Sequence, residues 1–537
     1  MTAWLRRCRR SLPTAGLLLG FGILFVYPIG RLLLLPWLPS LGPEESAYGE
    51  LSGLPVDAIL NTLRLGIAST LVAVPLGVVA GWLLERRRWR TQAFLMLTLW
   101  LIFLTPSYLL TTGWQIIFAL PWLHHSLLSH VFFSQVGIVA LLGLKGLPFA
   151  TLAARSSWRA IGAEILDAAR IHVTNTWQRR SILLRLLLPA AGSALAVVFI
   201  ESIQEFGIPA TLGAQIHLPI ITYAIYERLA TTPVDFINAA RLSWSLVGLA
   251  LLAAVFHIYL SGRYGGALIH GKQRRQSQVE CSAVERAMGN LMTLGLALLG
   301  VILPGIAIAH AALQPGDANA AIPVDWSSLS HSCLYAALGG MLAVTLSLAL
   351  IQFQRRSQGR LGQLVDLLSL GNMAIPGLVL GAAYVIAFNF RWLPLYGTPL
   401  LLIIAYVAAQ VPMLMRFLQA PVGQIHLNLA DAARLHGLPW STRAADIHAP
   451  LLLSPFLWGW TMAFGQIFFE LPVSELLYPA GGAPVGVAVV ALNQSLRYAE
   501  ASRLALAGIG VSLLVAGCTA LLMRLAITIP MAQERTT

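Results

Sequence analysis

Long apolar runs dominate the chain, and each is long enough to cross a lipid bilayer as a helix. Spanning the hydrocarbon core takes roughly 20 apolar residues, and about twelve such runs lie between charged or Pro/Gly-rich breaks. Hydrophobic residues make up 57% of the 537 positions and charged residues only 11%, which leaves too little polar surface to coat a soluble particle of this size. We therefore predict an all-α integral membrane protein.

The apolar runs divide evenly between the two halves of the chain. The first half holds residues 15–35, 59–84, 94–120, 131–154, 186–206 and 242–260, and the second holds residues 291–313, 332–353, 367–390, 400–418, 451–469 and 504–522. The first run follows a cluster of arginines, but no small-residue cleavage site comes after it. We interpret it as an uncleaved membrane helix rather than a signal peptide.

Basic residues gather in alternate connections between the runs. The chain carries 35 Lys and Arg against 22 Asp and Glu, and most of the basic residues fall at the N-terminus and in every second connection. The basic connections include residues 86–90, 155–185, 263–286 and 355–360. Positively charged connections stay in the cytoplasm, so we predict a multi-pass protein with both termini cytoplasmic. Because these clusters lie between apolar runs, we expect membrane lipid and not nucleic acid as their surroundings.

The first half of the sequence recurs in the second half. An Asp-Ala-Ala triplet follows the fourth run of each half, and two polar positions in the fifth run recur at nearly the same displacement. The matching residues are Asp167, Ala168 and Ala169 with Asp431, Ala432 and Ala433, and Glu201 and Glu205 with Gln466 and Glu470. We predict two tandem six-helix repeats, residues 1–262 and 290–537, joined by a polar cytoplasmic linker at 263–289.

The two triplets lie in long cytoplasmic connections, residues 155–188 and 419–450. In the second copy, the triplet is followed by Gly437, then an apolar residue, and finally Pro450. This pattern resembles the signature loop of ABC importer permeases, in which a short helix lies parallel to the membrane and ends at the glycine. The first copy has Val173 at the glycine position, so its helix is expected to end differently.

The resemblance implies a type I ABC importer permease fold in the bacterial inner membrane. It also implies two kinds of partner: a pair of ATP-binding cassette ATPase subunits, expected to be a homodimer, and a periplasmic substrate-binding protein on the opposite face. The ATPase would hydrolyse ATP, so the chain itself is not expected to be an enzyme. The coupling residues that the resemblance implies are Asp167, Ala168, Ala169, Val173, Asp431, Ala432, Ala433 and Gly437.

Further motifs narrow the resemblance within this class. Those that resemble the fused permeases of ferric-iron importers are Asn61-Thr62-Leu63, Ile375-Pro376-Gly377, Glu470-Leu471-Pro472 and Tyr498-Ala499-Glu500-Ala501. The resemblance covers nearly the whole chain and implies a permease that passes ferric iron. Permeases for thiamine, phosphonates, polyamines or sulfate share the fold and some of these residues, and they stay as alternatives.

Acidic residues inside predicted spans are costly and call for a role. Glu201 and Glu205 lie four residues apart on one helical face, and the repeat brings Gln466 and Glu470 to the matching face of the other half. We predict that these four side chains line the translocation path, where oxygen ligands suit a hard cation. The alternative is that the carboxylates cap helices or pair structurally, with arginines 228, 241 and 497 as the available partners.

A second class of function is an ion-coupled secondary transporter, which also often has twelve helices in two repeats. Such a transporter has no need of paired helix-forming connections at matching positions, and these therefore favour the importer. Neither a Ser, His and carboxylate arrangement nor a His, Cys or carboxylate cluster with metal-ligand spacing is present. We expect no catalytic residues, no bound metal and no cofactor.

Overall fold

The computed structural model describes residues 15–38, 55–85, 91–160, 171, 175, 178, 191–192, 194–264, 282–314, 325–357, 360–390, 393–425, 433, 435–437 and 439–533. In this part of the chain, nine helices are long and apolar enough to span a membrane, or up to eleven if each of two bent pairs is one span. Two-residue strands β1 (Asn389–Phe390) and β2 (Leu393–Pro394) pair antiparallel. The predicted all-α membrane fold is confirmed.

Each half begins with a helix that contains a π-helical turn. In the first half, the described elements are η1 (Gly22–Val26), α2 (Tyr27–Leu34), α3 (Val56–Leu84), α4 (Gln92–Leu104), α5 (Ser107–Phe118), α6 (Pro121–His124), α7 (Leu127–Phe132), α8 (Gln135–Ala160), the helix Ala194–Gln204, η4 (Pro209–Gly213), α11 (Ile221–Ala230) and α12 (Phe236–Tyr264). The fifth predicted span, 186–206, is thus described mainly over Ala194–Gln204, because most of its N-terminal part lies outside the described residues.

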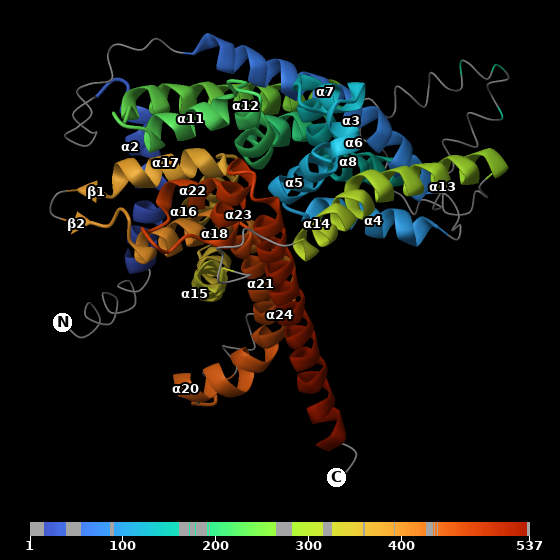
Figure 1. The fold of residues 1–537 in the computed structure, drawn as a ribbon. Coiled ribbons are helices and arrows are strands. Elements are labelled where there is room, and N and C mark those ends of the chain that lie inside the picture. Colours follow the sequence, from blue (N-terminus) through green and yellow to red (C-terminus); the bar gives the residue numbers. More distant parts are fainter. Residues whose placement is uncertain are drawn as a thin grey trace.

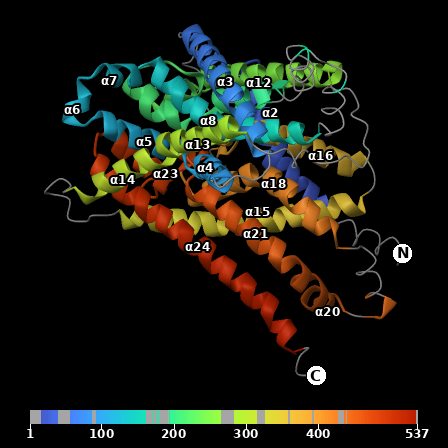
Figure 2. The same ribbon diagram turned by 90° about the vertical axis from the view of Figure 1, so that its right-hand side faces the viewer.

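The second half repeats this order. Its described elements are α13 (Ala283–Ala297), η6 (Leu298–Ile302), α14 (Leu303–Leu313), α15 (Trp326–Arg356), α16 (Arg360–Met373), α17 (Gly377–Ala387), α18 (Pro399–Gly423), α20 (Trp440–Thr442), η7 (Arg443–His448), α21 (Ala449–Phe468), α22 (Pro472–Leu477), α23 (Val485–Gln494) and α24 (Tyr498–Gln533). Helix α13 begins inside the predicted linker, where Ser282 and Glu285 form a capping box. In both views, α21 and α24 extend beyond the rest of the bundle (Figures 1 and 2).

The third span of each half, predicted over 94–120 and 367–390, is broken into two helices. Helices α4 and α5 meet at 99°, and α16 and α17 meet at 109°. A proline lacks the backbone N–H and disfavours the helical conformation of the residue before it. Thr105, before Pro106, accordingly has an extended ψ of 124°, and Pro376 stands at the second break. Apolar composition does not distinguish a bent span from a straight one, so the sequence analysis gave these two spans without their bends.

The two halves exchange their first helices. Helix α2 packs against α17 of the other half, and α14 packs against α5, with α13 beside α4 (Figures 1 and 2). The backbones approach closely at Gly113 of α5, where a Cβ atom would lie 2.6 Å from the Cβ atom of Pro304 and 2.8 Å from its backbone. A larger residue at Gly113 would separate these two helices.

Two matching hydrogen bonds hold the exchanged helices in place. The Tyr384 hydroxyl donates to the carbonyl oxygen of Leu24 at 2.8 Å, and the indole Nε1 of Trp114 donates to that of Leu299 at 3.0 Å. Both acceptors belong to π-helical turns, η1 and η6, where the hydrogen-bond pattern of the helix is locally widened. Both donors occupy the same position relative to the break of their own helix, so the contact follows the internal repeat.

Gly77 sets the distance between α3 and α8, which pack along most of their length. A Cβ atom at Gly77 would lie 2.4 Å from the Cβ atom of Ala150 and 2.9 Å from its carbonyl carbon. Small residues let membrane helices approach closely. Gly77→Ala is therefore expected to destabilise the fold by about 1–3 kcal/mol and to lower the melting temperature in detergent. In Gly248→Ala, the new Cβ atom meets nothing within 4 Å. Equal melting temperatures for the two variants would contradict this assignment.

Candidate translocation site

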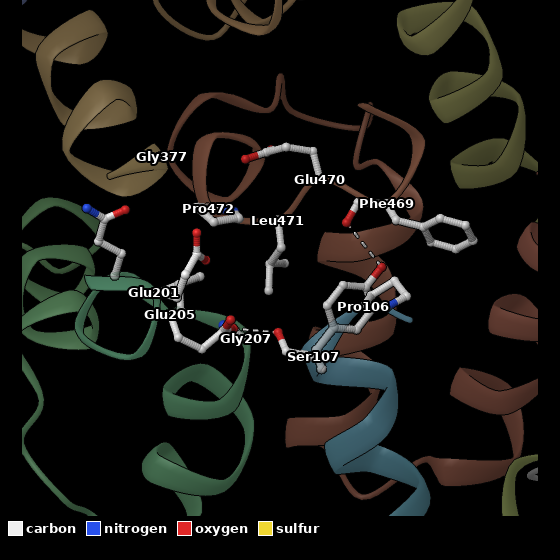
Figure 3. A pocket seen from close by; sticks show the side chains of 13 residues that line it. Pro106, Ser107, Glu201, Glu205, Gly207, Gly377, Phe469, Glu470, Leu471 and Pro472 are labelled. Atoms are coloured by element: carbon white, nitrogen blue, oxygen red, sulfur yellow. Dashed lines mark hydrogen bonds between the residues drawn. The ribbon is translucent and has the colours of Figure 1, made fainter. Parts of the chain in front are cut away.

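A cavity of about 260 Å³ lies between the two halves, where the helix breaks meet the ends of the fifth spans. Both Pro106 at the first break and Gly377 at the second border it, and the remaining wall comes from the segments around Glu205 and Glu470 (Figure 3). Its lining residues are Pro106, Ser107, Tyr108, Glu201, Gln204, Glu205, Phe206, Gly207, Gly377, Phe469, Glu470, Leu471 and Pro472. Three of the four predicted path residues, Glu201, Glu205 and Glu470, therefore share one cavity.

Glu205 is held in place by two donors. Its Oε1 accepts hydrogen bonds from the Ser107 hydroxyl at 2.5 Å and from the backbone N–H of Gly207 at 2.8 Å. The first donor begins α5 directly after the break, and the second begins the helical segment that leads into η4. A carboxylate at a helix N-terminus satisfies a free N–H group and is favoured by the helix dipole. Glu205 thus ties the broken third helix to the end of the fifth span.

Glu470 occupies the matching place in the second half. Its two carboxylate oxygens accept from the backbone N–H of Val473 at 2.7 Å and of Ser474 at 2.9 Å, at the start of α22. The Ser474 hydroxyl also bonds the carboxylate and lies 2.6 Å from the hydroxyl of buried Tyr406. In this structure Glu470 caps a helix and lines the cavity at the same time.

The other two predicted path residues differ from each other. Glu201 is exposed, lines the cavity, and makes no hydrogen bond to another residue of the described part of the chain. Gln466 does not line the cavity, and its amide contacts the sulfur of Met413 at 3.3 Å. The three arginines that could have paired with these carboxylates contact other residues. Arg228 pairs with Asp235, Arg241 donates to Asn238, and Arg497 pairs with Glu500.

The predicted coupling residues lie mostly outside the described part of the chain, including Asp167, Ala168, Ala169, Val173, Asp431 and Ala432. Of the second copy, Ala433 and Leu435 are helical, and Ala433 is buried. Gly437 follows with φ of +72°, a left-handed conformation that glycine adopts without strain. This geometry is the one expected of a glycine that ends a helix.

Comparison with known proteins assigns the family. Residues 73–270 and 339–528 each match the sequence model of one family, described as the binding-protein-dependent transport system inner membrane component. This chain belongs to that family. The two matches fall in the two halves of this inner membrane transport component, in agreement with the predicted duplication. The predicted type I permease fold is therefore confirmed.

Relatives of this transport component carry more specific names. A ferric transport system permease protein of Actinobacillus pleuropneumoniae is 25% identical over 320 residues, which is 56% of this chain and 45% of the relative. An Fe(3+)-transport system permease protein of Haemophilus influenzae is 26% identical over 468 residues, covering 84% of this chain and 87% of the relative. This chain spans only about half the length of two of the curated relatives that it matches, 55% of one and 45% of the other.

The sequence analysis of this transport component missed two exposed apolar residues. Ile171 and Leu435 each lie four positions after the aspartate of their triplet, and their side chains are 75% and 89% exposed. The sequence could have indicated them, because both polar connections have a branched apolar residue four positions after the aspartate. The same position of both repeats therefore presents an apolar side chain outside the membrane bundle.

It also missed a cation beside the acidic side chains. Lys145 lies in α8, within the fourth span, and borders a smaller cavity together with Glu201 and Glu205. The signal was a single lysine in an otherwise apolar run. Among the described residues of this transport component, no three His, Cys, Asp or Glu side chains are arranged to hold one metal ion. What the structure shows for Glu201, Glu205 and Glu470 is a shared position in the wall of the large cavity.

Proposed function

We propose that this chain is the membrane permease of an ATP-binding-cassette importer for ferric iron. The observation that carries the proposal is the pair of family matches, since a binding-protein-dependent inner membrane component works with a binding protein. The names of the relatives, which refer to ferric transport, support iron as the substrate. Thiamine, phosphonate, polyamine and sulfate remain the alternative substrates.

In this proposal the cation passes between the two helix breaks. Glu201 and Glu205 from the first half and Glu470 from the second supply oxygen ligands on opposite walls of one cavity. Carboxylate oxygens suit a hard cation. Gln466 would contribute only in another conformation, because it lies away from the cavity in this one. The helix breaks support a passage, because non-helical backbone at membrane depth is tolerated where it lines a cavity.

The partners follow from the same proposal. A homodimer of ATPase subunits would dock on the coupling segments, with residues 167–169 and 173 in one copy and 431–433 and 437 in the other. Exposed Ile171 and Leu435 would enter the two matching clefts, because large apolar side chains commonly anchor such interfaces. The excess of Lys and Arg near the coupling segments supports a cytoplasmic location for them and for both termini. A periplasmic binding protein would then deliver substrate on the opposite face of the inner membrane.

ATP-driven closure of the ATPases would push the coupling segments together and tilt the bundles around the cavity. The Pro106 and Pro376 breaks border or flank this cavity, so a tilt would change its width directly. The chain in this scheme transmits force and forms the passage, and it hydrolyses no ATP itself.

Reconstitution with the cognate ATPase and binding protein in liposomes tests the proposal. We expect accumulation of radioactive iron that requires both internal ATP and the iron-loaded binding protein, and that persists when an ionophore removes the proton gradient. Binding proteins loaded with thiamine or phosphonate serve as controls and should give no transport. Iron accumulation driven by a proton or sodium gradient without ATP would instead favour an ion-coupled secondary transporter.

A further inference from the structure

Lys145 fastens the first helix break from the side of α8. Its ammonium group donates to three carbonyl oxygens at the C-terminal end of α4, those of Ile102 at 3.0 Å, Phe103 at 3.2 Å and Thr105 at 2.7 Å. The break frees these carbonyls from helical hydrogen bonds, and a cation is favoured at a helix C-terminus. These contacts satisfy the ammonium donors, but they leave its positive charge uncompensated.

The nearest negative charges are those of the first half's carboxylates. Lys145, Glu201 and Glu205 line one small cavity of about 30 Å³, and both carboxylates also line the large cavity. The two carboxylates are therefore shared by the small and the large cavity, whereas Lys145 lines only the small one. Glu205 has its own donors in Ser107 and Gly207, whereas Glu201 makes no hydrogen bond within the described residues. Among the residues that line this small cavity, Lys145 is the one cation that can compensate the charge of Glu201.

The internal repeat supports this pairing independently. Glu201 corresponds to uncharged Gln466 in the second half. The displacement that relates Pro148 to Pro412 carries Lys145 to Ala409, and the one that relates Glu205 to Glu470 carries it to Gln410. Neither counterpart is charged. At these two positions the first half therefore carries one additional charge of each sign, and both border the same small cavity.

We propose that Lys145 is a positioning residue of the passage, which balances the charge of Glu201 while it holds the break of the third helix. Each half then presents one uncompensated carboxylate to the large cavity, Glu205 in the first and Glu470 in the second. An unpaired charge inside a membrane bundle is costly, so loss of either partner should harm the protein more than loss of both. This inference rests on the proposed function, because it assumes that the cavity is the passage.

The test is a double-mutant cycle on the reconstituted complex, with Lys145→Gln, Glu201→Gln and the combination of both. Lys145→Gln is expected to lower the iron uptake rate by about tenfold and to lower the melting temperature of the permease. Adding Glu201→Gln should restore most of the lost melting temperature, because it makes the first half resemble the second. It should restore uptake only in part, because Glu201 is also a proposed ligand of the cation. If the lysine only fastened α4, the double variant would be as impaired as Lys145→Gln, and this result would overturn the proposal.

The matched control is Lys145→Gln combined with Glu205→Gln. Because Glu205 has two donors of its own, its removal should not rescue the lysine variant. Equal rescue by both glutamate variants would overturn the assignment to Glu201. The melting temperature can be measured without any substrate. If Glu201→Gln restores the melting temperature of Lys145→Gln but the wild-type permease imports no iron, the pairing is supported and the proposed substrate is refuted. If the wild type imports iron but Glu201→Gln does not restore the melting temperature of Lys145→Gln, the pairing is refuted and the proposed substrate is supported.

Discussion

A Leu435→Asp variant is expected to lose ATP-driven uptake almost completely while still folding in the membrane. Leu435 is 89% exposed, two residues before the glycine that ends its helical segment, so its side chain contributes little to the fold. A buried apolar anchor of an interface is commonly worth about 2–4 kcal/mol, which corresponds to a loss of ATPase affinity of roughly 30- to 1,000-fold. The measurement is co-purification of the cognate ATPase, followed by ATPase activity with the loaded binding protein.

Leu313→Asp is the matched control for this prediction. Leu313 is also highly exposed, at 86%, but it ends α14, on the face that the distribution of basic residues assigns to the periplasm. We expect this variant to retain the ATPase. Retention of the ATPase by both variants, or its loss in both, would contradict a specific role of the coupling segment.

The second large effect is expected for Glu470→Ala. The alanine removes the acceptor of two backbone N–H groups and of the Ser474 hydroxyl, and it also removes a negative charge from the cavity. Loss of a helix cap typically costs about 1 kcal/mol, and unsatisfied buried donors cost about 1–3 kcal/mol more. We expect a lower melting temperature because the cap is lost. Iron uptake should fall by about a hundredfold because the passing cation loses a carboxylate ligand, at about 1.4 kcal/mol of lost interaction for each tenfold.

Glu470→Gln separates the two roles of this side chain. Glutamine keeps one of the two acceptor oxygens, so α22 loses only part of its cap. The melting temperature should fall less than in Glu470→Ala, while uptake falls with the lost charge. As a control, Glu500→Gln alters an ion pair with Arg497 at the start of α24 and should change neither measurement by much. Normal uptake in Glu470→Gln would leave the carboxylate with a capping role alone.

The membrane spans and the acidic cluster could be predicted because each depends on a local or repeated pattern. Apolar length alone identifies a span, and the fifth-span glutamates recur at nearly constant displacement in the two halves. Glu205 and Glu470 thus meet at one cavity as the repeat predicted. The bends at Pro106 and Pro376 were present in the sequence, but a proline inside a membrane helix is often tolerated and gives no angle. Pro148 within α8 and Pro75 within α3 lie in continuous helices.

The exchange of the first helices could not be predicted from composition. A face that meets lipid and a face that meets another helix are equally apolar, so hydropathy does not identify the partner. The decisive contacts are single ones, such as Trp114 with Leu299 and the close approach of Gly113 to Pro304. Lys145 escaped notice for a related reason: its partners are backbone carbonyls at a break that the sequence did not reveal.

The packing of the exchanged helices determines which parts of the molecule can move as rigid bodies. Helix α2 is held by α17 of the other half, and α14 is held both by α5 of the other half and by α24 of its own, so each repeat is tied to a helix of its twin. The mobile units of a transport cycle would then be chimeric, each assembled from both copies of the ancestral gene. Pulling the copies apart would extract a leading helix from each partner bundle, so the duplicated unit is mechanically interlocked as well as covalently joined.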